Sequence, residues 1–132
     1  MTTRRVLIVD DEPYILRILA FKFRRAGYDA VEAPDLIEAL AALERSPVHC
    51  IVLDVSLGYD QDGFEFAGRL RDDVRFCRTP VVFLTAHSLP ADIRRGEQLG
   101  AASYITKPFS LDRVLAEVDR ITLAEGEGPA AR

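Results

Sequence analysis

Residues 5–13 read RVLIVDDEP, and this stretch decides the fold. Four branched apolar residues stand in an unbroken run, and three acids and a proline follow at once. An unbroken apolar run of this length predicts a strand that is buried on both faces, as in a parallel sheet covered by helices. The proline predicts the first turn of a helix. We therefore predict a strand followed directly by a helix, with carboxylates at the junction.

The same strand-then-helix order repeats along the chain. Short apolar runs predict strands at residues 6–9, 28–33, 50–53, 81–84 and 102–106. Apolar spacing and capping residues predict helices at 13–26, 36–45, 63–73, 90–99 and 111–124, with Asp35 and Ser110 as N-caps. Within the third helix, Phe64 and Phe66 are expected to be half core and half surface. This alternation favours an α/β fold with a doubly wound sheet.

Bulk properties set limits on the function. The 132 residues fit one domain, which we expect to span residues 1–124, with a flexible tail or linker stub at 125–132. A formal net charge of −4 gives no electrostatic footprint for nucleic acid. The sequence has neither an apolar stretch long enough to cross a membrane nor a signal-peptide pattern. These properties predict a cytoplasmic domain.

Acidic residues stand where two of the buried strands end. Asp10 and Asp11 follow the first strand, and Asp54 follows the third. In an open α/β sheet, ligands bind at the carboxyl ends of the strands. Three carboxylates at one edge repel one another, and a divalent cation would neutralise them. Such oxygen ligands suit Mg²⁺, which combines carboxylates with phosphate oxygens.

Two further residues complete this edge of the sheet. Thr85, after the fourth strand, offers a hydroxyl that can donate to a phosphoryl oxygen, and Lys107, after the fifth, supplies a positive charge. Aspartate is ionised at neutral pH and can act as a nucleophile. The residue types alone therefore predict a phosphoryl-acceptor site that uses Mg²⁺.

Five segments carry a resemblance to a known family: VLIVDDEP (6–13), IVLDVSL (51–57), DGFEF (62–66), VVFLTA (81–86) and GAASYITKPF (100–109). In this order they resemble the motifs of bacterial two-component response regulator receiver domains, from Arg5 to about Leu123. The resemblance implies a flavodoxin-like receiver fold with a five-stranded parallel sheet of order 2-1-3-4-5.

The resemblance also implies roles for individual residues. Asp54 would be the phosphorylated residue. The Mg²⁺ ligands would be Asp11, Asp54 and the backbone carbonyl of Ser56, with Asp10 helping, often through water. Thr85 and Lys107 would bind the phosphoryl oxygens. Thr85 and Tyr104 would form the switch: the phosphoryl group would draw Thr85 toward it, and the Tyr104 ring would move into the space vacated. The peptide bond between Lys107 and Pro108 would be cis.

Partners follow from the same resemblance. The phosphoryl donor would be a histidine kinase or a phosphotransfer protein. The signal would pass through the face formed by the fourth helix, fifth strand and fifth helix, where receivers often also form homodimers. The recipient would be a downstream protein or a C-terminal effector domain, and the sequence leaves both open. The domain itself is expected to bind neither nucleic acid nor membrane, and to catalyse only its own phosphoryl acceptance and loss.

One segment departs from the family pattern. The family places a Leu-Pro pair soon after the acceptor and an Asp-Gly pair eight residues on. Here Gly58 follows Leu57, and Gly63 lies nine residues after Asp54. The loop 58–62 is therefore about one residue longer than usual and lacks the proline.

Three other functions are compatible with parts of the sequence. A flavodoxin-type enzyme or carrier would share the strand order, but it would need a phosphate-friendly loop where three acids stand. An aspartate-nucleophile phosphatase would place a second acid where Ser56 stands. A receiver-like interaction module that is never phosphorylated would keep the fold, although here every acceptor-site residue is present.

Overall fold

The computed structural model describes residues 3–58 and 61–124, in which five strands alternate with five helices. The strands are β1 (Arg5–Val9), β2 (Asp29–Ala33), β3 (Cys50–Leu53), β4 (Val81–Thr85) and β5 (Ser103–Thr106). The helices are α1 (Pro13–Arg25), α2 (Leu36–Arg45), α3 (Gly63–Arg71), α4 (Pro90–Gln98) and α5 (Leu111–Ala124). The predicted tail at 125–132 lies outside the described residues.

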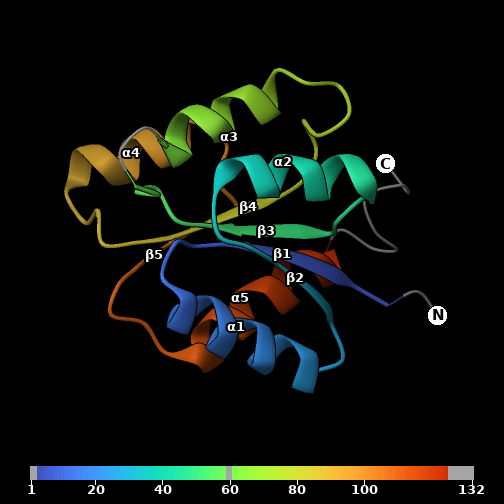
Figure 1. Cartoon of the computed structure of the whole chain (residues 1–132). Helices are drawn as coiled ribbons and strands as arrows, with labels where there is room; N and C mark the ends of the chain where they lie inside the picture. Colours follow the sequence, from blue (N-terminus) through green and yellow to red (C-terminus); the bar gives the residue numbers. More distant parts are fainter. Residues whose placement is uncertain (1–2, 59–60, 125–132) are drawn as a thin grey trace.

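The strands form one parallel sheet in the order β2-β1-β3-β4-β5, as predicted. Helices α1 and α5 cover one face of the sheet, and α2, α3 and α4 cover the other (Figure 1). Because all strands run in the same direction, their carboxyl ends meet at one edge. This edge carries the acids and the lysine that the sequence singled out.

The apolar runs of the strands fill two cores, one on each face of the sheet. Leu7 and Val9 face the helices α2 and α3, whereas Val6 and Ile8 face α1 and α5. All four are buried. Each such burial contributes roughly 1.5–3 kcal/mol relative to exposure. The unbroken run in β1 thus reflects a strand that is covered on both faces.

Local signals at the helix ends are confirmed. The Asp35 carboxylate accepts from the Glu38 N–H at 2.8 Å, and the Ser110 hydroxyl accepts from the Arg113 N–H at 2.9 Å. Helices α1, α3 and α4 end one or two residues before their predicted ends, because those residues form the closing turn rather than the helix. No helix in the described part of the chain is both long and apolar enough to cross a bilayer.

One expectation about the core was wrong. Phe64 and Phe66 are both buried rather than half exposed. Phe64 packs edge-on against Phe83 of β4, with 5.2 Å between ring centroids. The first turn of α3 lies so close to the sheet that both rings are covered.

Candidate functional site

Three carboxylates converge at the carboxyl edge of the sheet. Strands β1 and β3 are neighbours, and Val9 pairs with Leu53, so the residues that follow them emerge side by side. Asp10 and Asp54 are buried, whereas Asp11 is exposed. One oxygen from each of the three lies within 4.8 Å of the others. The structure thus brings together the three acids that the sequence predicted as metal ligands.

Lys107 reaches the same cluster from the end of β5. Its Nζ lies 3.1 Å from Asp10 Oδ2, 3.1 Å from Asp54 Oδ2 and 3.3 Å from Glu12 Oε1. Burial alone would lower the pKa of the Lys107 ammonium, but the carboxylates of Asp54 and Asp10 outweigh it and raise that pKa. Lys107 therefore stays protonated and holds its positive charge beside Asp54, the predicted acceptor. The peptide bond that follows it, to Pro108, is cis as expected.

Negative charge exceeds positive charge at this edge. Burial raises the pKa of the Asp10 carboxyl, and the Asp54 charge adds to the rise, against hydrogen bonds from the Glu12 N–H and Lys107. Among residues 3–58 and 61–124, a single ammonium, that of Lys107, faces the carboxylates of Asp10, Glu12 and Asp54, with Asp11 beside them. Hard oxygen donors around an uncompensated charge suit Mg²⁺, so the donor set fits this ion.

His87 contacts both Thr85 and Ser56 beside the acceptor site. The Thr85 side chain is fully buried, and its Oγ1 accepts from the His87 N–H at 3.2 Å. The Ser56 N–H donates to Asp54 Oδ1 at 3.2 Å, and its hydroxyl lies 2.6 Å from the His87 ring Nε2. The loops after β3 and β4 are therefore tied together beside the acceptor.

Tyr104 connects this network to α4. Its hydroxyl donates to the His87 carbonyl at 2.7 Å, and its ring packs on Phe83 with 5.7 Å between centroids. Burial, followed by the charges of Asp92 and Asp54, raises the pKa of Tyr104 to about 12. The ring is expected to move on activation, and in this structure it lies inward against Phe83 and is partly buried.

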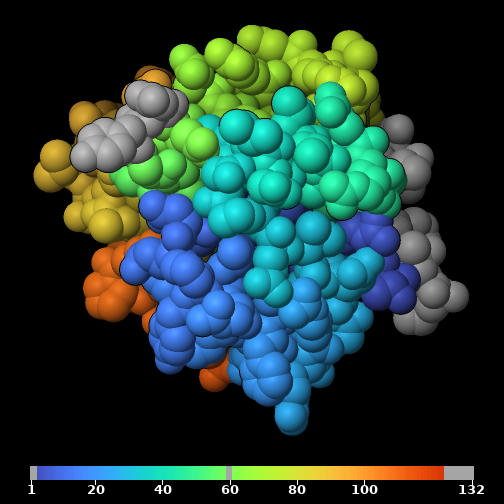
Figure 2. All heavy atoms as spheres, viewed as in Figure 1, coloured from blue at the N-terminus to red at the C-terminus, as the bar shows by residue number. Residues whose placement is uncertain are grey.

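The longer loop after β3 closes on itself. Ser56 and Asp62 form an isolated antiparallel bridge, and Gly58 adopts a φ of +88° between them. Residues 59–60 lie outside the described part. The side chain of Gln61 accepts from the Leu36 N–H at 2.7 Å and so ties the loop to α2. In Figure 2, the segment after β3 (green) meets the segment after β1 (blue) at the left of the view.

The sequence places His87, two residues after Thr85, and Ser56 beside the phosphoryl site, and the structure brings the two side chains into contact. The contacts of His87 with Thr85 and Tyr104 had no spacing signal. Two further contributions were not predicted. Glu12 contacts Lys107, and the run of three acids was the available signal. Gly63 donates its N–H to the Val55 carbonyl at 2.7 Å and packs directly against the acceptor strand.

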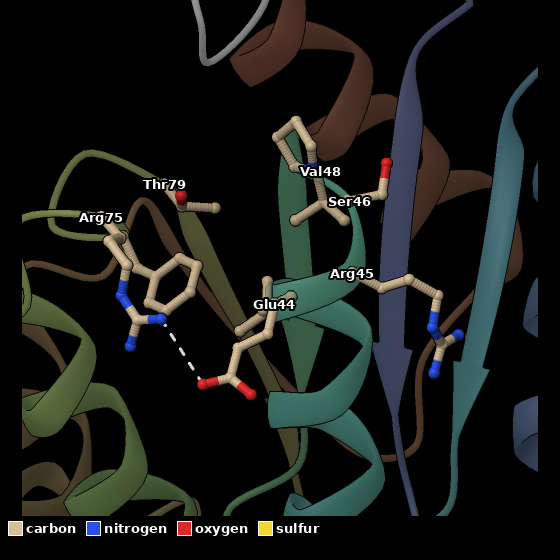
Figure 3. A pocket seen from close by; sticks show the side chains of 9 residues that line it. Glu44, Arg45, Ser46, Val48, Arg75 and Thr79 are labelled. Atoms are coloured by element: carbon tan, nitrogen blue, oxygen red, sulfur yellow. Dashed lines mark hydrogen bonds and ion pairs between the residues drawn. The ribbon is translucent and has the colours of Figure 1, made fainter.

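A cavity of about 240 Å³ lies far from these residues, at the edge where the strands begin (Figure 3). It is lined by the end of α2 and by residues just before β3 and β4. The Arg75 guanidinium in its wall is paired with Glu44 at 3.4 Å and with Asp73 at 2.8 Å. Because the positive charge of Arg75 is paired with these two carboxylates, the charges in this wall do not point to phosphoryl-acceptor chemistry like that expected at the acidic edge.

The fold and this edge define a class of protein. The family model of the response regulator receiver domain matches residues 6–119. The chain belongs to this family, whose members serve in two-component systems, and it has the flavodoxin-like receiver fold expected from its motifs.

Particular proteins can be named as relatives. The chain is 39% identical over 114 residues to the DNA-binding dual master transcriptional regulator RpaA of Synechocystis. It is 40% identical over 118 residues to the alkaline phosphatase synthesis transcriptional regulatory protein PhoP of Bacillus subtilis. The matches cover 86% and 89% of this chain but only 47% and 48% of these relatives, so the chain spans about half their length.

Among solved structures, the chemotaxis protein CheY4 of Vibrio cholerae superposes with a TM-score of 0.84 at 30% identity. This match covers 91% of the chain described here and 99% of the CheY4 chain.

Proposed function

We propose that this domain accepts a phosphoryl group on Asp54 from a histidine kinase or a phosphotransfer protein, in a reaction that requires Mg²⁺. The observation that carries the proposal is the contact of Lys107 Nζ with Asp54 Oδ2 at 3.1 Å, inside a cluster of three carboxylates. A lysine and several acids held together at one sheet edge are hard to explain as packing. They are suited to a site that receives a phosphoryl group together with a metal ion.

In this proposal Asp11, Asp54 and the Ser56 carbonyl would hold the Mg²⁺, with Asp10 helping. When bound, the ion would neutralise the carboxylates and draw phosphoryl oxygens to this edge. An oxygen of the Asp54 carboxylate attacks phosphorus while the bond from phosphorus to the donor's histidine nitrogen breaks, which leaves an acyl phosphate and a free imidazole. Lys107 offsets the charge on the phosphoryl oxygens, and the Thr85 hydroxyl donates to one of them.

We propose an apolar surface beside Lys107 as the docking site of the donor protein. A cavity of about 310 Å³ is lined by Tyr14, Ile15, Ile18, Lys107, Pro108, Phe109 and Leu111. The Tyr14 side chain in it is largely exposed. The surface is continuous with the acceptor through Lys107, so a protein that covers it would deliver its histidine to Asp54. Replacing Tyr14 with Ala should slow transfer from a protein donor and leave labelling by acetyl phosphate unchanged.

The output side of the proposal rests on the relatives. RpaA and PhoP are named as transcriptional regulators, so we extend the proposal to a DNA-binding effector or another protein target that receives the signal. The signal would leave through the face of α4, β5 and α5, which would also be the surface of any homodimer. The domain would turn over no substrate other than its own phosphoryl group and would itself contact neither nucleic acid nor membrane.

The melting temperature in the presence of beryllofluoride, which mimics a phosphoryl group on a carboxylate, tests the proposal. The wild type should melt at a higher temperature with Mg²⁺ and beryllofluoride together, because ligands that bind only the folded state stabilise it, by about 2.7 kcal/mol at 100 times the Kd. Asp54→Asn should abolish the rise, whereas Asp72→Asn, the same change at an exposed position, should not. A rise that persists in Asp54→Asn would contradict the proposal, and no rise in the wild type would favour a receiver-like module that works without phosphorylation.

A further inference from the structure

Helix α4 contacts the sheet in an unusual way. It is the most polar of the five helices, and the residue that it buries is a glycine, Gly96. Ile93 and Leu99 are only partly covered. A glycine inside a helix weakens it relative to alanine because it adds conformational freedom to the unfolded chain. Its presence at the one buried position of α4 therefore calls for a packing reason.

The ring of Tyr104 supplies that reason. A Cβ built on Gly96 would lie 2.7 Å from Tyr104 Cδ2 and 2.9 Å from Cε2, closer than side chains approach each other. It would also lie 3.4 Å from Phe83 Cδ2. The ring cannot easily move aside, because its hydroxyl is bonded to the His87 carbonyl and its other neighbours include Phe83.

We propose that Gly96 is a positioning residue that forms, with Phe83 and the His87 carbonyl, a seat for the Tyr104 ring. The inward position of this ring and the docking of α4 on the sheet are then one event. A side chain at position 96 excludes the seated ring. This part of the inference stands on packing alone.

A second part rests on the proposed function. Thr85 Oγ1 accepts from the His87 N–H, and the His87 carbonyl accepts from the Tyr104 hydroxyl. A continuous chain of contacts therefore links the phosphoryl-binding threonine, through His87 and Tyr104, to Gly96 of α4. A phosphoryl group that binds Thr85 stabilises the Tyr104 ring in its seat. By thermodynamic linkage, the factor by which it favours the seated ring is also the factor by which loss of the ring from the seat weakens binding of the phosphoryl mimic.

A double-mutant cycle in urea unfolding tests the seat. Gly96→Ala should lower the folding equilibrium constant of the wild type by about tenfold or more, as overpacking does. In a Tyr104→Ala background, Gly96→Ala should raise the folding equilibrium constant by about two- to fivefold. The clash with the ring is then absent, and the higher helix propensity of alanine remains. The matched control is Gly68→Ala in α3, whose Cβ would meet Leu99 Cδ2 at an ordinary 3.5 Å and should not destabilise either background. If Gly96→Ala changed the folding equilibrium constant in the same direction in both backgrounds, the proposal would be overturned.

Fluorine NMR of fluorotyrosine-labelled protein provides a readout that does not depend on stability. The chain has four tyrosines, and Tyr104→Phe assigns the resonance of interest. In Gly96→Ala this resonance should move toward that of a solvent-exposed tyrosine, and an unmoved resonance would overturn the proposed seat.

Titration with beryllofluoride and Mg²⁺ separates the two parts. Gly96→Ala should bind the mimic about tenfold more weakly than the wild type, a coupling within the usual range of about 5- to 150-fold. Equal affinity would refute the link to phosphorylation while the seat stands. No binding by the wild type would refute the proposed function and, with it, the second part alone.

Discussion

Gly63 is the residue that fixes the distance between α3 and the acceptor strand. A Cβ at this position would lie 2.4 Å from the Asp54 carbonyl oxygen and 2.8 Å from Val55 Cα. Both are backbone atoms, so no side-chain rotation relieves the contact. The Gly63 N–H also donates to the Val55 carbonyl at 2.7 Å. Gly63→Ala must therefore push the first turn of α3 away from β3.

The size of the effect follows from these contacts. Overpacking against rigid neighbours costs about 3 kcal/mol at the upper end of its usual range. Weakening the bond to Val55 costs about 1 kcal/mol more. The higher helix propensity of alanine stabilises the variant by up to about 1 kcal/mol. We expect a net loss of about 3 kcal/mol in the free energy of unfolding.

Urea unfolding followed by circular dichroism measures this loss. Gly68→Ala, in the middle of the same helix, is the control, because its Cβ meets only Leu99 Cδ2 at 3.5 Å. The control should gain up to about 1 kcal/mol. Phosphorylation of Asp54 should also be slower in Gly63→Ala, because the displaced backbone carries the acceptor. A Gly63→Ala protein as stable as the wild type would refute the reasoning.

Three further predictions concern other parts of the domain. Tyr28→Phe should cost about 1–2 kcal/mol in urea unfolding, because the buried hydroxyl donates to Asp119 at 2.6 Å; an unchanged midpoint would contradict this. Because the pKa of Tyr104 is raised to about 12 while an unfolded tyrosine ionises near 10, its contribution to stability is intact below pH 10 and is lost as the pH rises toward 12. The absorbance difference at alkaline pH between wild type and Tyr104→Phe should have its midpoint near 12. A midpoint near 10 would count against the partly buried position of the ring. Asp11→Asn should weaken Mg²⁺ binding by about tenfold or more, on the order of 1.4 kcal/mol, in a calorimetric titration, and equal affinity would remove Asp11 from the ligand set.

Much of the fold could be predicted because its signals are local. The apolar runs of β1, β3 and β4 are unbroken because these strands are covered on both faces, and the caps Asp35 and Ser110 act on their own helices. The acids and the lysine could be placed together because parallel strands all end at one edge. Order along the chain was therefore sufficient to gather Asp10, Asp54 and Lys107.

Other features depend on which surfaces meet in three dimensions. No pattern in the sequence shows that Gly96 lies under the Tyr104 ring, since the two residues belong to different elements and the contact depends on how α4 is tilted onto the sheet. The same holds for the bond between Ser56 and His87, which joins two loops. Phe64 and Phe66 were expected to be partly exposed because helical spacing cannot show how deeply the close approach at Gly63 buries both rings.

The most direct test is the intact mass of the protein after incubation with acetyl phosphate, with and without Mg²⁺, for the wild type and Asp54→Asn. The account predicts a gain of one phosphoryl group, about 80 Da, in the wild type with Mg²⁺ only, and no gain in the variant. An equal gain in Asp54→Asn, or a gain that does not depend on Mg²⁺, would contradict the assignment of Asp54 and its metal site. No gain under any condition would contradict phosphoryl acceptance itself.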